Sequence, residues 1–122
     1  PFARLRQLNA NQVAEAQWVL RERGSGTRSV FEQTLIRLGL SPQTLNVVIE
    51  LPSNEAIRAV VEAGMGLTAI SRFVVESALR SKSLISLKFA PIERPFKLIT
   101  HPERKPTYAA TAFIEMLKLR AL

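Results

Sequence analysis

The chain has 122 residues, of which 47% are hydrophobic and 22% charged, a composition typical of one compact globular domain. It contains no cysteine, which excludes disulfides, thiolate catalysis and thiol-bound zinc. The net charge is +7, but the basic residues are scattered from Arg4 to Arg120 and no aromatic residue is interleaved with a basic cluster. We therefore interpret the charge chiefly as solvated surface charge, with binding of an anionic ligand as the second interpretation. Nucleic-acid binding has little support.

The first strand–helix unit begins with Gln17–Arg21, a short run with β-favouring residues that predicts a strand. A glycine-rich turn follows at Arg23–Thr27. The helix after it places Phe31, Leu35 and Leu38 at positions i, i+4 and i+7, which predicts one buried stripe.

The second unit repeats this order. The nearly unbroken apolar centre of Leu45–Leu51 predicts a strand buried on both faces, as in a parallel sheet. The turn Pro52–Asn54 follows, in which Ser53 or Asn54 is suited to cap the next helix, and Gly64 ends that helix.

Three further strands and two helices complete the pattern. Leu67–Ile70 predicts a short central strand, and a helix opens at Ser71. Strands are also expected at Leu84–Phe89, where alternation suggests one buried face, and at Phe96–Thr100. Thr107 is suited to cap a last helix, whose apolar stripe between Ala109 and Leu117 is expected to be core, or an exposed adhesive face if its partner is missing.

Alternating strands and helices predict an α/β fold with a mostly parallel sheet flanked by helices. Ligands in such folds bind at the carboxyl ends of the strands. That rule selects the turns Gly24–Arg28, Pro52–Glu55 and Ser71–Arg72, which are expected to converge on one rim.

The turn Gly24–Arg28 carries the strongest local signal. Its glycines allow close approach to a ligand, the unpaired amides of the first helical turn attract a negative charge, and Arg28 adds a cationic donor. The alternative is that these residues only turn the chain and cap helices. We expect an effector site for a carboxylate, sulfate or phosphate-like anion, formed by Ser25, Gly26, Thr27, Arg28, Pro52, Ser53, Asn54 and Ser71.

Catalysis has little support in the sequence. His101 is the only histidine and lies in a polar loop without a nucleophile beside it, and Glu50 and Glu55 fall on different elements. No cluster suits a metal, and we expect no cofactor and no enzyme activity. An enzyme in which Arg28 or Lys97 steers an anionic substrate is the weaker alternative.

Several segments together resemble the effector-binding, or substrate-binding, domain of LysR-type transcriptional regulators. They match in order and spacing over about residues 10–120, and they are Trp18–Glu22, Gly24–Arg28, Phe31–Glu32, Glu50–Ile57, Val61–Leu67, Arg94–Phe96 and the last helix with Phe113. The resemblance implies two lobes like those of type 2 periplasmic binding proteins, with the effector between them.

By this resemblance, residues 1–16 belong to an incomplete first lobe, residues 17–89 form the second lobe, and residues 90–122 return to the first lobe with a strand and a helix. Because the chain begins at Pro1 and shows no helix-turn-helix, we expect a piece of a longer cytoplasmic regulator that contacts DNA only through an absent N-terminal domain. We also expect self-association and no membrane contact. The alternative is a type 2 periplasmic solute-binding protein for a small anion.

Overall fold

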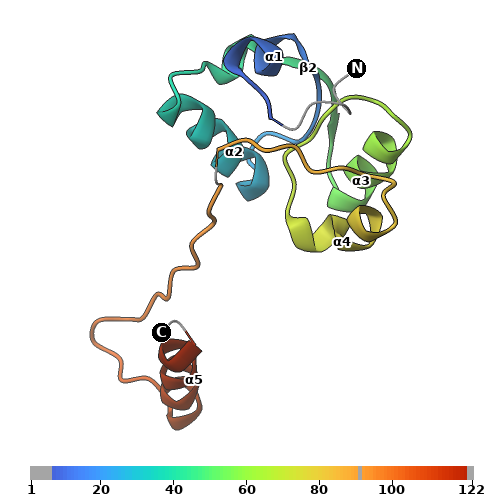
Figure 1. The fold of residues 1–122 in the computed structure, drawn as a ribbon. Helices are drawn as coiled ribbons and strands as arrows, with labels where there is room; N and C mark the ends of the chain where they lie inside the picture. Colours follow the sequence, from blue (N-terminus) through green and yellow to red (C-terminus); the bar gives the residue numbers. More distant parts are fainter. Residues whose placement is uncertain (1–6, 91, 121–122) are drawn as a thin grey trace.

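The computed structural model describes residues 7–90 and 92–120. The elements are α1 (Ala10–Glu15), β1 (Gln17–Arg21), α2 (Gly26–Arg37), the 3-10 turn η2 (Pro42–Thr44), β2 (Asn46–Leu51), α3 (Asn54–Glu62), α4 (Arg72–Arg80) and α5 (Tyr108–Arg120). Figure 1 shows α1 to α4 gathered in one body and α5 apart from it, at the end of an extended segment. The predicted α/β class is confirmed.

The sheet consists of β1 and β2, which run in parallel as predicted. Gln17 lies opposite Asn46 and Arg21 opposite Leu51, with one irregular step after Trp18. The carboxyl ends of both strands therefore meet at one edge, and α2 and α3 begin beyond that edge.

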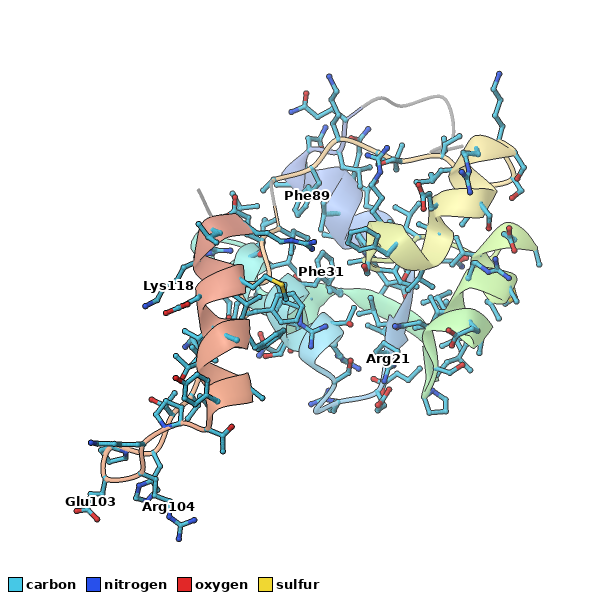
Figure 2. The ribbon with its side chains drawn as sticks, turned by 90° about the horizontal axis from the view of Figure 1, so that it is seen from below. Arg21, Phe31, Phe89, Glu103, Arg104 and Lys118 are labelled. Atoms are coloured by element: carbon cyan, nitrogen blue, oxygen red, sulfur yellow. The ribbon has the colours of Figure 1, made fainter. Side chains whose placement is uncertain are left out.

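The core lies around Trp18, which is only 3% exposed. Its ring lies 4.9 Å from the ring of Phe31, and its Nε1 donates to the Val13 carbonyl at 2.8 Å. Phe31 in turn meets Phe89 edge-on, with 6.5 Å between the ring centroids, and both residues are labelled in Figure 2. Leu35 shares this core as the helical spacing predicted, whereas Leu38 lies just after the end of α2 and is 49% exposed.

Residues 7–16 pack on the same core. Asn9 and Gln12 cap α1 reciprocally, and Leu8, Val13 and Ala16 are buried beside Trp18. The assignment of residues 1–16 to a separate lobe stays a prediction, and its first six residues lie outside the described ones.

The prediction that β2 is buried on both faces is wrong. Val47, Ile49 and Leu51 are half-buried, but Val48 and Glu50 on the opposite face are exposed. The reason is that a strand face is buried only by elements that pack on it, and in the described ranges Val48 stays 40% exposed even though Arg28 of α2 reaches Glu50 on this face.

The three remaining predicted strands do not form as such. Leu67–Ile70 contributes a single parallel bridge between Leu67 and Trp18, and Leu84–Phe89 contributes one between Lys88 and Gln7. Phe96–Thr100 has no regular structure, and its Phe96 is 98% exposed. A strand needs neighbours on its sides to hold its backbone, and these segments have at most one such neighbour among the described residues.

The helix α5 forms where it was predicted. Thr107 caps it through a bond from the Ala110 amide to its hydroxyl at 3.2 Å. None of its residues is buried, and Phe113 is 54% exposed. The expectation of a core stripe is therefore wrong for the described residues, and the alternative of an exposed apolar face is what they show.

Candidate functional site

The helix α2 begins directly after a glycine turn at the end of β1. Gly24 has a φ of 93°, a left-handed conformation that glycine adopts without strain. Ser25 is the N-cap and is buried, but its hydroxyl makes no capping bond. Within the described chain, the amides of Gly26 and Thr27 donate to no backbone carbonyl, so the first turn of α2 keeps donors available for a ligand.

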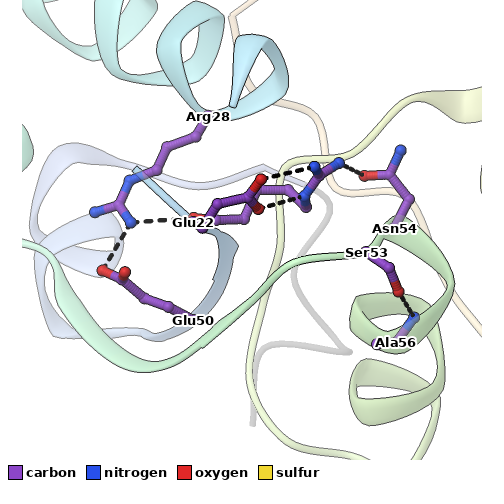
Figure 3. A network of polar contacts seen from close by, with 7 residues as sticks. Glu22, Arg28, Glu50, Ser53, Asn54 and Ala56 are labelled. Carbon is purple, nitrogen blue, oxygen red and sulfur yellow. Dashed lines mark hydrogen bonds and ion pairs between the residues drawn. The ribbon is translucent and has the colours of Figure 1, made fainter. Parts of the chain in front are cut away.

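Arg28 turns its guanidinium away from that turn and toward β2. The side chain is 6% exposed; its Nε lies 2.7 Å from a Glu32 oxygen and one Nη lies 2.7 Å from a Glu50 oxygen. The same Nη donates to the Arg21 carbonyl at 3.0 Å (Figure 3). Burial lowers the pKa of Arg28, but the bonds and charges of the two glutamates raise it more, so the net pKa is raised. Arg28 thus joins α2 to the sheet.

A second pair of contacts links the end of β1 to the start of α3. The Arg21 guanidinium holds both carboxylate oxygens of Glu22, at 2.8 and 3.0 Å, and donates to Asn54 Oδ1 at 2.9 Å (Figure 3). The bond with Glu22 raises the pKa of Arg21 and lowers the pKa of the Glu22 carboxyl. The starts of α2 and α3 are therefore neighbours at the carboxyl edge of the sheet.

The start of α3 is capped as predicted. Ser53 Oγ accepts from the Ala56 amide at 3.0 Å, which uses that hydroxyl within the protein (Figure 3). Pro52 precedes it and is exposed. Ser71 is the exposed N-cap of α4, and its hydroxyl makes no capping bond.

A cavity of about 780 Å³ lies beside the starts of α2 and α4. Thr27 and Ser71 both line it, together with Trp18, Phe31 and Phe89 from the core. The structure therefore divides the predicted site residues. Thr27 and Ser71 meet at the cavity, whereas Arg28 and Asn54 belong to the polar network at the sheet edge.

Sequence reasoning missed two residues at these places. Arg21 was counted only as part of a strand, and Arg94 only as part of a family motif. Arg94 lies against Gly26, since a Cβ built on Gly26 would lie 2.8 Å from an Arg94 Nη atom. The order of residues along the chain holds no signal for this contact, because Arg94 lies beyond α4 and Gly26 begins α2.

Two observations on the described residues concern catalysis and metal binding. His101 is exposed, and its Nδ1 accepts from the Glu103 amide at 3.2 Å. No three His, Cys, Asp or Glu side chains of this part of the chain lie together as a metal site requires. No helix among residues 7–90 and 92–120 has the length and apolar character needed to cross a membrane.

The amino-acid sequence matches a known protein family. The model of the LysR substrate-binding domain matches residues 1–121. The chain belongs to this family. Among its relatives are the HTH-type transcriptional regulator CysL of Bacillus subtilis (31% identical over 120 residues) and the RuBisCO operon transcriptional regulator of Allochromatium vinosum (31% over 119). The HTH-type transcriptional regulator CbbR of Rhizobium meliloti is 33% identical over 116 residues.

These matches cover nearly all of the LysR-family chain but a minor part of each relative. The shares of this chain are 97%, 96% and 93%, and those of the relatives are 39%, 38% and 36% in the same order. The chain thus spans well under half the length of the curated relatives it matches.

Proposed function

We propose that this chain is the effector-sensing part of a LysR-type transcription regulator and that its effector is a small anion. The relatives are named as transcriptional regulators, and the chain matches the part of them that the family model describes as substrate-binding. The observation that carries the anion is the start of α2, where unpaired amides and an uncommitted Ser25 hydroxyl lie next to Thr27, which lines the cavity.

The proposed site has a direct and an indirect part. Ser25, Gly26 and Thr27 at α2 and Ser71 at α4 offer amides and hydroxyls to the anion. Arg28 acts by holding α2 in place, since its charge is already matched by Glu32 and Glu50. The turn at α3, with Pro52, Ser53 and Asn54, borders the same rim through the bond between Asn54 and Arg21.

In the whole regulator, the effector would lie between this lobe and a first lobe, and binding would bias the arrangement of the lobes. DNA would be contacted by an N-terminal domain outside these 122 residues, and the protein would work in the cytoplasm. A periplasmic solute-binding protein fits the fold as well, but the relatives named above are transcriptional regulators, which favours the sensor.

Self-association is part of the proposal. The α5 helix exposes Phe113, Met116 and Leu117, and β2 exposes Val48 at the edge of the sheet. Apolar faces of this kind are usually covered in the working protein, and a second copy of the chain offers the same faces in return.

Isothermal titration with sulfate, phosphate and acetate tests whether the chain binds a small anion. We expect heat with at least one of these anions and a loss of affinity of about tenfold in Thr27→Ala, because one hydrogen bond to a charged group is removed. Thr100→Ala is the matched control, since Thr100 is exposed on the extended segment. Absence of heat with all three anions, or equal losses in both variants, would contradict the proposal.

A further inference from the structure

We propose that Arg94 binds the charged group of the effector, and that the effector is an amphipathic anion, with one carboxylate or phosphate-like group on an apolar body. The proposal rests on the proposed function, because it concerns the same cavity. It adds a residue that neither the sequence motifs nor the family match assigns, and it narrows the class of ligand.

The first observation is the place of Arg94. Its guanidinium lies so close to Gly26 that any side chain there would displace it. Gly26 is the first residue of α2, whose unpaired amides form the positive end of the helix dipole. Arg94 is exposed and forms no ion pair with any residue in the described ranges. Two positive groups thus lie side by side, and an anion bound next to both would receive bonds from both.

The second observation is the segregation of charge around the cavity. The described lining residues include three cations, Arg72, Lys88 and Arg94, and no aspartate or glutamate. The nearby carboxylates Glu32 and Glu50 are instead paired with Arg28 on the other side of α2. The cavity is therefore a positive environment, which suits an anion and disfavours a cation.

The third observation is the apolar wall. Trp18, Phe31, Val75 and Phe89 belong to a lining that is mostly hydrophobic. Thr68 also lines it, and its Oγ1 is buried without a hydrogen-bond partner in the described chain. An inorganic oxyanion needs little more room than a few water molecules of about 30 Å³ each, so it would leave most of the 780 Å³ unfilled. An apolar body would cover the wall, as in most small-molecule sites.

Arg94 also connects the cavity to the rest of the chain. It lies on the segment that leaves the body near α2 and leads to α5 (Figure 1). A ligand held by Gly26 and Arg94 at once would fasten this segment to the body. Ligand binding would then change the position of everything that follows Arg94.

Trp18 is the only tryptophan and lines the cavity, so its fluorescence reports binding in the 122-residue chain. We would titrate the chain with octanoate, octanol and sulfate. We expect octanoate to bind about tenfold more tightly than either of the others, because only octanoate satisfies both the cations and the apolar wall. Arg94→Gln should bring octanoate to within about twofold of octanol while octanol binding stays unchanged.

Arg120→Gln is the matched control, since it removes the same charge at the end of α5 and should leave all three affinities unchanged. Sulfate binding as tightly as octanoate, with both weakened by Thr27→Ala, would leave the proposed function standing and overturn the amphipathic class. Octanol binding as tightly as octanoate, with no effect of Arg94→Gln, would overturn the role of Arg94. If none of the three binds by fluorescence or by heat, the proposed function and this inference fail together.

Discussion

Replacing Arg28 with methionine tests whether the buried guanidinium stabilises the junction of α2 with the sheet. Methionine keeps much of the apolar stem and removes the contacts with Glu32, Glu50 and the Arg21 carbonyl. Removing one partner of a fully buried ion pair costs about 3–5 kcal/mol. Here Glu32 and Glu50 stay 34% and 42% exposed, so water solvates the carboxylates that are left behind.

With that discount we expect Arg28→Met to lower the free energy of unfolding by about 2 kcal/mol. Urea unfolding followed through Trp18 fluorescence measures this loss, which corresponds to a midpoint about 1 M lower. Arg104→Met is the control, because Arg104 is exposed in the loop before α5 (Figure 2) and should change stability by less than about 0.5 kcal/mol.

A double-mutant cycle with Glu50→Gln isolates the pair itself. We expect a coupling free energy on the order of 1 kcal/mol between Arg28 and Glu50. Equal midpoints for Arg28→Met and Arg104→Met, or additive effects in the cycle, would refute the reasoning that this pair fixes α2 on the sheet.

Two further predictions concern the backbone contact at Gly66 and the exposed apolar face of α5. Gly66 and Gly39 have φ values of 79° and 76°, but a Cβ on Gly66 would collide with the Gln17 carbonyl, whereas Gly39 faces open space. Both substitutions to alanine carry about 1–2 kcal/mol of left-handed strain. In urea unfolding, Gly66→Ala should lower the free energy of unfolding by about 2 kcal/mol more than Gly39→Ala does. Equal losses in the two variants would contradict the contact between Gly66 and the Gln17 carbonyl. Phe113→Asp should weaken self-association about tenfold in sedimentation velocity, since it places a charge on the exposed face of α5. A wild-type chain that stays monomeric at high concentration would refute that face as an interface.

The sequence predicted those features that depend on neighbours along the chain. Ser53 caps α3 and Thr107 caps α5 because an N-cap is decided within four residues. Gly64 adopts the left-handed conformation just after α3, where its type predicted the end of that helix. The alternation of β1, α2 and β2 was sufficient to predict a parallel pair.

The sequence did not predict features that depend on distant partners. The residues around Val48 do not indicate that one face of β2 is exposed to solvent, because burial depends on which elements pack on that face. The apolar pattern of Phe96–Thr100 predicts a strand that no described neighbour completes. At the candidate site, the same limit applies to Arg28 with Glu50 and to Arg94 with Gly26, whose members lie on different elements.

Because α5 lies apart from the body formed by α1 to α4 (Figure 1), the stability of this helix depends on more than its own backbone bonds. A helix of 13 residues is marginal in water when only its own backbone bonds sustain it, and no residue of α5 is buried. The helicity of residues 108–120 therefore depends on whatever surface comes to cover Phe113 and its neighbours. Slowed amide hydrogen exchange in that stretch would register docking directly, whether the covering surface belongs to another lobe or to a second copy.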